Sequence, residues 1–364
     1  MEEFLQMHSW EDVKVRSLIG KYGIAGSLGL VYMTTWIPLI LLSAFSEKGL
    51  PDVAIHVRFL ISLPLLLYSF PAMVKKQNWV LRHIQETRIL DESDREALNN
   101  MLTHTDALMN SDFSRAIILA LSYVTSIWTY LTLQRPLQQW SSFDGPPGWY
   151  YHLILQPLYN YVVLRVVFYL LVRFRICFSL ARMKLNLRPA HGDGIGGLGF
   201  LSSTLVVFSL PAFALSSSSA AGAANLVIHN LVALEGLKLL VSVYAVLIIL
   251  LLVVPYFLFI PPLLRARAEA IDLYGVLASD QTGDFYRSWL NHTHMHADTL
   301  AAGDFSAITD FGSEVGRVHS MRLIPVKPRD MIILVLAIAV PFFFVFSLKM
   351  SWQAIFNGLL SLLH

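Results

Sequence analysis

Length, composition and charge indicate a protein that lies in a membrane. Of the 364 residues, 55% are hydrophobic and 14% are charged, whereas about 25% of the residues in soluble globular proteins are charged. The net charge of +2 leaves no general excess for binding polyanions, so we expect no nucleic-acid partner. The single cysteine, Cys177, excludes an intrachain disulfide and a thiolate metal cluster. Nothing in the sequence predicts a cofactor or a bound metal.

The N-terminal segment differs from a secretory signal peptide. It opens with Met1, Glu2 and Glu3, and this charge has the wrong sign for the basic start of a signal. Basic residues between positions 14 and 21 then lead directly into the first apolar block. We therefore expect that block to be an uncleaved anchor.

Seven apolar blocks of about twenty residues follow one another along the chain. An α-helix needs this length to cross a hydrocarbon core of about 30 Å. The blocks lack the alternation of barrel strands, and backbone amides in lipid must pair within their own segment. We therefore predict an all-α, polytopic membrane helix bundle that forms a single domain over residues 1–364. The predicted spans are residues 23–45, 54–74, 113–133, 151–172, 194–215, 231–260 and 331–348.

The distribution of basic residues predicts the orientation of these spans. Most of the 27 Lys and Arg residues lie before the first span or in residues 75–112, 173–193 and 263–328. Lys and Arg gather in cytoplasmic segments, so the N-terminus is predicted to lie in the cytoplasm. An odd number of spans then places the C-terminus outside.

Three segments between or after the spans are predicted to be helical. Residues 75–112 contain a capping box, formed by Ser93 and Glu96, at the start of a helix. Residues 263–328 should hold two cytoplasmic amphipathic helices, with the first apolar stripe at Leu264, Ala268, Ile271 and Leu277. The tail, residues 349–364, is too short to span and is predicted to be an interfacial amphipathic helix.

A glycine-rich turn between the fourth and fifth spans is the most informative motif. Gly192, Gly194 and Gly197 have the spacing of a dinucleotide fingerprint, but that fingerprint needs a preceding strand, and the chain offers none. The free amides at the start of the fifth span favour an anion; alternatively, the glycines serve close helix packing. The candidate ligand-binding residues are Arg182, Lys184, Arg188, His191, Asp193, Gly194, Gly196 and Gly197. For Asp193, helix capping competes with a proton-handling or metal role shared with His191.

Ionisable residues inside the predicted spans form a second candidate set. Arg165 lies deep in the fourth span, where a charged group is expensive and usually faces the bundle interior. It could snorkel to the cytoplasmic face, line an anion path or pair with an acid. Glu235 and Lys238 are three residues apart and could satisfy one another, and Arg58 and His56 could join them.

The glycine-rich string from His191 to Leu201 resembles a known sequence pattern. It is similar to the His-Pro-Asp-Gly-x-Gly-Gly-Leu-Gly-Phe-Leu string of an uncharacterised family of bacterial polytopic membrane proteins. A second string, between Asp304 and Pro325, is similar to the segment before that family's last span. The resemblance implies a location in the bacterial inner membrane and nothing catalytic. Gly192 stands where the family has proline, which predicts a looser turn.

These features leave three functional hypotheses. The first is a homo-oligomeric membrane channel or transport protein, either for anions or controlled by an anionic cytoplasmic ligand. The second is a membrane-anchored sensor or effector that binds a protein partner through its cytoplasmic helices. The third, a lipid-active enzyme using His191 and Asp193, lacks the usual hydrolase and nucleotide-binding motifs. His292, His294 and His296 are interpreted as surface residues, because no further ligands complete a metal site.

Overall fold

The structure is a computed structural model that describes residues 10–44, 52–134, 145–228, 234–287 and 304–347. Within these ranges the regular structure is helical, and an isolated β-bridge joins Leu90 and Leu185. The all-α prediction is therefore confirmed. The interfacial tail and the cluster of His292, His294 and His296 lie outside the described residues.

Long helices alternate with short helical turns along the chain. In the first half of the chain they are α1 (Trp10–Thr34), α2 (Trp36–Ala44), α3 (Val53–Val57), η1 (Arg58–Ser62), α4 (Leu63–Glu86), η2 (Glu92–Asp94), α5 (Arg95–Asn110), α6 (Asp112–Thr129) and η3 (Tyr130–Gln134). In the second half they are α7 (Pro146–Tyr150), η5 (Tyr151–Leu155), α8 (Gln156–Arg182), η6 (Gly199–Ser202), α9 (Ser203–Ile228), α10 (Leu234–Phe257), α11 (Ile260–Phe285), α12 (Asp304–His319) and α13 (Pro328–Ser347).

Five helical segments are long and apolar enough to cross a membrane. They are Glu11–Ala44, Val53–Glu86, Gly199–Ile228, Gly236–Phe257 and Pro328–Ser347. The predicted third and fourth spans correspond to α6 and α8, which are helical but fall outside this set. Arg165, Arg173 and Arg175 lower the apolar character of α8. The membrane-protein prediction is supported, while the number of seven spans stays a prediction.

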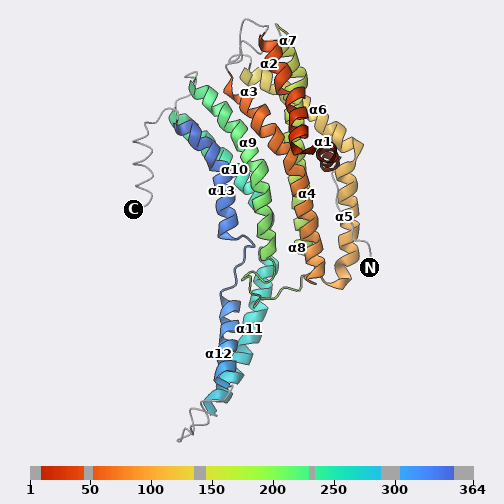
Figure 1. Cartoon of the computed structure of the whole chain (residues 1–364). Coiled ribbons are helices and arrows are strands. Elements are labelled where there is room, and N and C mark those ends of the chain that lie inside the picture. The colour runs from red at the N-terminus through yellow and green to blue at the C-terminus, as the bar shows by residue number, and fades with distance from the viewer. Residues whose placement is uncertain (1–9, 45–51, 135–144, 229–233, 288–303, 348–364) are drawn as a thin grey trace.

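Figure 1 shows one bundle from which a helical hairpin projects. Helix α9 contacts α4 on one side and α13 on the other, and α8 contacts both α4 and α6. Helices α11 and α12 pack against each other below the bundle (Figure 1). Tyr274 and Phe311 stack across this hairpin with ring centroids 6.1 Å apart.

The contact face of α11 differs from the predicted stripe. Leu263 and Ala270 are buried and Tyr274 meets α12, whereas Leu264, Ala268 and Leu277 are exposed. Three of the four residues of the predicted stripe are therefore exposed, and the fourth, Ile271, is half-buried. The prediction missed the contact face, because α11 carries apolar residues on more than one side.

Two further boundaries differ from the sequence predictions. Helix α9 continues past the predicted end of the fifth span at residue 215, through a run of serines and alanines, to Ile228. Buried alanines of this run pack against Phe342 and Val345 of α13, because small side chains let two helices approach closely. The capping box is replaced by Asp91, whose side chain accepts a hydrogen bond from the backbone of Ser93 (3.0 Å).

Gly23 divides α1 into two differently oriented parts (Figure 1). Its backbone has φ 70° and ψ 176°, a conformation that an L residue with a side chain rarely adopts. The predicted first span begins at this residue. The part before Gly23 carries the buried acidic residues Glu11 and Asp12 back onto the bundle.

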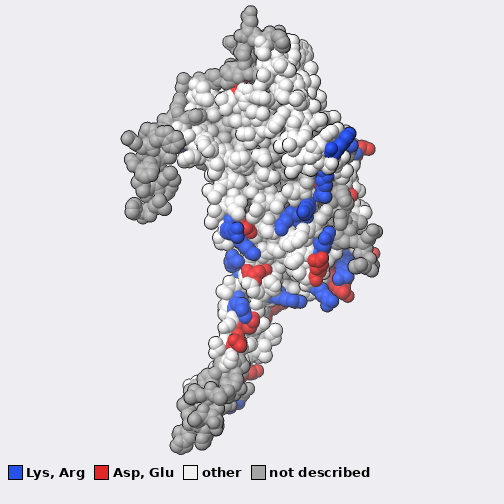
Figure 2. Space-filling view, viewed as in Figure 1, with Lys and Arg blue, Asp and Glu red and all other residues white. Residues whose placement is uncertain are grey.

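Charged side chains gather at one end of the molecule. Figure 2 shows Lys, Arg, Asp and Glu along the lower part of the bundle and on the hairpin, while the described upper part of this face is almost free of them. This distribution matches an apolar layer bounded on one side by a charged end. Which end faces the cytoplasm stays a prediction.

Candidate functional site

Arg165 lies at the centre of a buried polar cluster. Its Nε atom is 2.6 Å from Oε1 of Glu11, and its Nη2 donates to Oε2 of the same carboxylate at 2.7 Å. The side chains of Arg165 and Glu11 are only 2% and 7% exposed. Nη2 also donates to the carbonyl of Met109 (3.2 Å). Of the alternatives for Arg165, the structure shows pairing with an acid.

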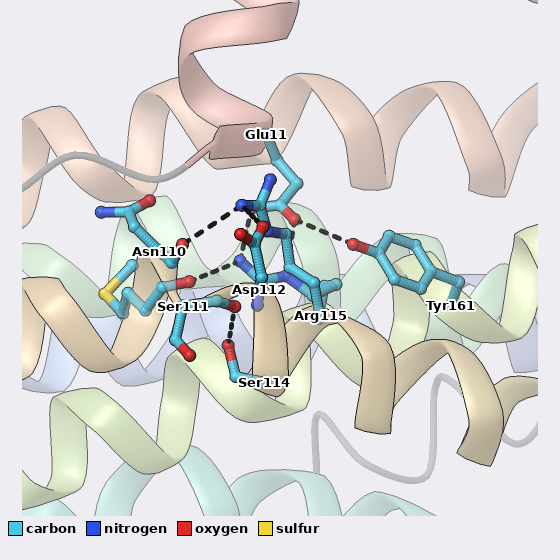
Figure 3. A network of polar contacts seen from close by, with 9 residues as sticks. Glu11, Asn110, Ser111, Asp112, Ser114, Arg115 and Tyr161 are labelled. Carbon is cyan, nitrogen blue, oxygen red and sulfur yellow. Dashed lines mark hydrogen bonds and ion pairs between the residues drawn. The ribbon is translucent and has the colours of Figure 1, made fainter.

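Three separate elements bring this cluster together on α8. Figure 3 shows Glu11, from the first part of α1, pointing toward Tyr161 of α8, whose hydroxyl donates to it at 3.4 Å. The junction between α5 and α6 closes the other side. There Ser114 donates to the carbonyl of Ser111 (2.8 Å), and Arg115 pairs with Asp112. The Glu11–Arg165 pair therefore ties α1 to the middle of α8 beside this junction.

Arg58 joins a second polar network near the other end of α8. Its Nη1 donates to the hydroxyl of Tyr151 (2.7 Å) and to Oε1 of Gln156 (2.6 Å), and its guanidinium lies 5.1 Å from the ring centre of Tyr159. Gln156 continues the network by donating to Asn160 at 3.1 Å. This network therefore connects α8 to the start of η1.

Two π-helical turns frame the Arg58 network. Arg58 begins η1 and Tyr151 begins η5. π-helical turns widen the helix locally and occur often at functional sites. Asn160 extends the network to α6 by donating to Thr125 and Ser126, each at 3.1 Å.

The predicted companions of Arg58 are arranged differently. His56 accepts a hydrogen bond from the indole of Trp36 (3.0 Å), and Lys238 is exposed. The side chain of Glu235 lies outside the described part of the chain, so its predicted pairing with Lys238 stays a prediction.

Arg173 is a buried cation whose importance the sequence did not reveal. Its side chain donates through Nη2 to Thr204 (2.8 Å) and to the hydroxyl of Tyr256 (2.7 Å). The guanidinium lies 4.5 Å from the ring centre of Phe208 and 5.0 Å from that of Tyr256. The residue is 3% exposed, and these partners are all neutral. From the sequence, Arg173 is one of the basic residues of segment 173–193 that predict the topology. Its place two helical turns after Arg165 was the available signal for a further role.

The glycine-rich turn holds a carboxylate of its own. Asp193 accepts hydrogen bonds from the backbone N–H groups of Ile195 (2.8 Å), Gly197 (3.1 Å) and Gly199 (2.7 Å). Its Oδ1 also lies 3.0 Å from Nδ1 of His191. Burial acts to raise the pKa of Asp193, but the backbone donors and His191 outweigh it, so the pKa lies below its ordinary value. Asp193 is thus the internal cap of the turn, and these amides already have an anionic partner.

The turn also joins two distant parts of the chain. Gly194, Gly196 and Gly197 have φ of +66°, +65° and +95°, and the carbonyl of Gly194 accepts from the backbone N–H of Arg322 (2.9 Å). A Cβ atom on Gly196 would lie 2.8 Å from Met321. The two strings that carry the family resemblance therefore pack against each other at the base of the bundle.

The three basic candidates of the turn are exposed. They are Arg182, Lys184 and Arg188. Lys184 is fixed through its backbone, because its N–H donates to Asp94 at 2.7 Å and its carbonyl accepts from Asp91 at 3.2 Å. The binding of an external anion by these side chains stays a prediction.

Comparison with known proteins adds no assignment, because no family model, curated protein or solved structure matches the chain. The described residues also contain no group of three His, Cys, Asp or Glu side chains that could hold a metal ion.

Proposed function

We propose that the protein is an integral membrane channel or transport protein for small anions. One observation carries this proposal: three guanidinium groups lie at three successive levels along α8. Arg58 bonds to Gln156 at its start, and Arg165 and Arg173 lie further along it. At about 1.5 Å per residue, successive levels are roughly 14 and 12 Å apart.

The partners of Arg58 and Arg173, unlike the Glu11 carboxylate that pairs with Arg165, support anion binding more than structural pairing. Arg58 and Arg173 bond to hydroxyl and amide groups, so within the described ranges neither positive charge is compensated by a direct ion pair. At Arg165, the carboxylate of Glu11 demonstrates that a negatively charged group fits against the guanidinium. Ionisable residues inside a membrane commonly mark the pathways of ions and substrates.

Anion flux into proteoliposomes tests the proposal. We expect the wild type to pass chloride or phosphate but not potassium, and Arg58→Gln and Arg173→Gln to reduce that flux or change its selectivity. Arg175→Gln removes one exposed positive charge from the same helix and serves as the control. A wild type that passes none of these ions, although correctly folded, contradicts the proposal.

We also propose how the chain is arranged in the membrane. We infer seven spans, with α6 and α8 added to the five apolar segments, an inside N-terminus and an outside C-terminus. The concentration of basic residues at one end supports this orientation. The proposal includes the bacterial inner membrane and a homo-oligomer, as the sequence resemblance and the first hypothesis suggested.

A second candidate function is that of a sensor or effector acting through the hairpin. Leu273, Val276 and Leu277 lie on one exposed face of α11, at 62%, 63% and 48% exposure. Such a face can bind a partner protein. Replacing all three with serine should abolish co-purification of that partner while leaving ion flux unchanged. If the hairpin has only a structural role, neither the co-purification of a partner nor the ion flux should change.

A further inference from the structure

A buried tyrosine hydroxyl and part of the Arg173 guanidinium lack hydrogen-bond partners among the described residues. Both hydrogen bonds of its guanidinium come from Nη2, so the N–H groups of Nε and Nη1 have no acceptor among the described residues. The hydroxyl of Tyr169, one turn earlier on α8, is also buried without a hydrogen-bond partner in the described structure. Both side chains lie against Phe208, with a ring-centre distance of 6.3 Å for Tyr169.

The described residues also give the Arg173 guanidinium no carboxylate partner. Thr204, which accepts from Arg173, lies in the first turn of α9, where the helix dipole adds further positive potential. Asp12 acts electrostatically on Tyr169, but its carboxylate is already paired with Arg16. A buried charge is costly unless an opposite charge or several hydrogen bonds compensate it. Tyr256, the other acceptor, lies in the last turn of α10, where the helix dipole acts in the opposite direction. Neither dipole is a full charge, so Arg173 has no counter-ion among the described residues.

We propose that Arg173 and Tyr169 form a binding site for a small monoanion between α8, α9 and α10. One guanidinium balances one negative charge, and the unused N–H groups of Arg173 and the O–H of Tyr169 supply the hydrogen bonds. The aromatic rings of Phe208 and Tyr256 hold the guanidinium in place, so these donors are already oriented. This inference rests on the proposed function and adds the place along α8 where the anion binds. The shared chemistry fits chloride, dihydrogen phosphate and the phosphodiester of an anionic lipid.

Anion-dependent thermal stability of the purified full chain tests the site. The protein is kept in detergent with sodium gluconate, and chloride or phosphate at pH 6 replaces gluconate at constant ionic strength. We expect the wild-type unfolding temperature to rise and saturate, because a ligand that binds only the folded state stabilises it. Arg173→Gln should abolish this rise, and Arg175→Gln, which changes an exposed arginine, should retain it.

Tyr169→Phe separates a binding site from a structural cluster. The variant keeps the ring and removes only the hydroxyl. If that hydroxyl binds the anion, the apparent affinity should fall about tenfold, as expected for the loss of one hydrogen bond to a charged group. If the cluster is merely structural, removing an unpaired buried hydroxyl leaves the response unchanged, and this result overturns the proposal.

Lipid addition identifies the source of the anion. Mixed micelles containing phosphatidylglycerol are compared with phosphatidylcholine micelles in gluconate. Protection by phosphatidylglycerol that requires Arg173 and Tyr169 supports the site with a lipid headgroup as its ligand. The absence of saturable stabilisation by chloride, phosphate and phosphatidylglycerol overturns it. Saturable binding without flux in proteoliposomes would leave the site standing while contradicting the transport proposal.

Discussion

Individual polar residues hold the bundle together because each has few alternatives inside an apolar surrounding. The Glu11–Arg165 pair illustrates this constraint. Its two charges are almost completely buried, so their desolvation cost offsets much of their mutual attraction. The pair therefore specifies where the first part of α1 docks more than it adds net stability. Removing one partner leaves the other charge buried without compensation.

Breaking this pair should be strongly destabilising. We predict that Glu11→Ala lowers the free energy of unfolding by about 3–5 kcal/mol, because the charge of Arg165 is left buried. The double variant Glu11→Ala/Arg165→Met should recover part of that loss. Glu92→Ala removes the partner of Arg95 in an exposed pair, and such pairs contribute about 0–1 kcal/mol. Chemical denaturation in detergent measures all three, and equal effects of the Glu11 and Glu92 variants would refute the argument.

Asp193 should make stability depend on pH in the acidic range. Its folded-state pKa is depressed, so its contribution is fully present above the unfolded-state pKa of about 3.9. That contribution is lost as the pH falls through the lower folded-state pKa. We predict that Asp193→Asn lowers stability at pH 7 by about 1.5–3 kcal/mol, the range for hydrogen bonds to a charged group. The difference from wild type should shrink below about pH 4.

Unfolding transitions recorded at several pH values test this expectation. Asp112→Asn, which changes a carboxylate whose side chain is 96% exposed, is the matched control and should show little of this dependence. A constant difference between wild type and Asp193→Asn from pH 7 to pH 3 would contradict the proposed role of the carboxylate.

At the scale of elements, the glycine turn connects the link between α8 and α9 to the link between α12 and α13. Gly196 allows this close approach, since it combines a φ of +65° with a near neighbour, Met321. Gly192 has neither feature, because a Cβ atom added to it would meet no atom within 4 Å and its φ is ordinary. The two glycines belong to one motif but carry different structural demands.

Alanine substitution at these two glycines should therefore have unequal effects. We predict that Gly196→Ala destabilises the protein by about 1–3 kcal/mol through backbone strain and overpacking, whereas Gly192→Ala is close to neutral. Thermal unfolding compares the two variants directly. A Gly192→Ala variant as unstable as Gly196→Ala would indicate that the whole string, and not this single contact, is constrained.

The sequence predicted elements better than it predicted contacts. The helical class and the extent of most apolar blocks follow from composition. The first predicted span begins at Gly23, but the bend of α1 at that residue was not predicted. The continuation of α9 past residue 215 was missed because its serines and alanines look like a loop until α13 covers them. The role of Arg173 was missed for a related reason, since Thr204, Phe208 and Tyr256 reach it from distant parts of the chain.

At the scale of the whole molecule, the number of spans depends on whether α6 and α8 cross the membrane. Helix α8 has 27 residues and is therefore about 40 Å long, enough to cross a bilayer, and α6 packs against it. If both cross, the chain has seven spans; if neither crosses, it has five. Both numbers are odd, so a reporter at the C-terminus is predicted to lie outside in either case. Only the connection between α6 and α8 distinguishes the two arrangements.

Cysteine labelling in that connection gives the decisive measurement. In a Cys177→Ser background, Ser141→Cys should react with a membrane-impermeant maleimide added outside intact cells, because seven spans place residue 141 there. Ser93→Cys, in the predicted cytoplasmic segment of residues 75–112, should react only after the cells are permeabilised. If Ser141→Cys also requires permeabilisation, α6 and α8 do not cross. The guanidinium groups of Arg165 and Arg173 would then lie beside the membrane and not along a path through it, and the transport proposal would lose its main support.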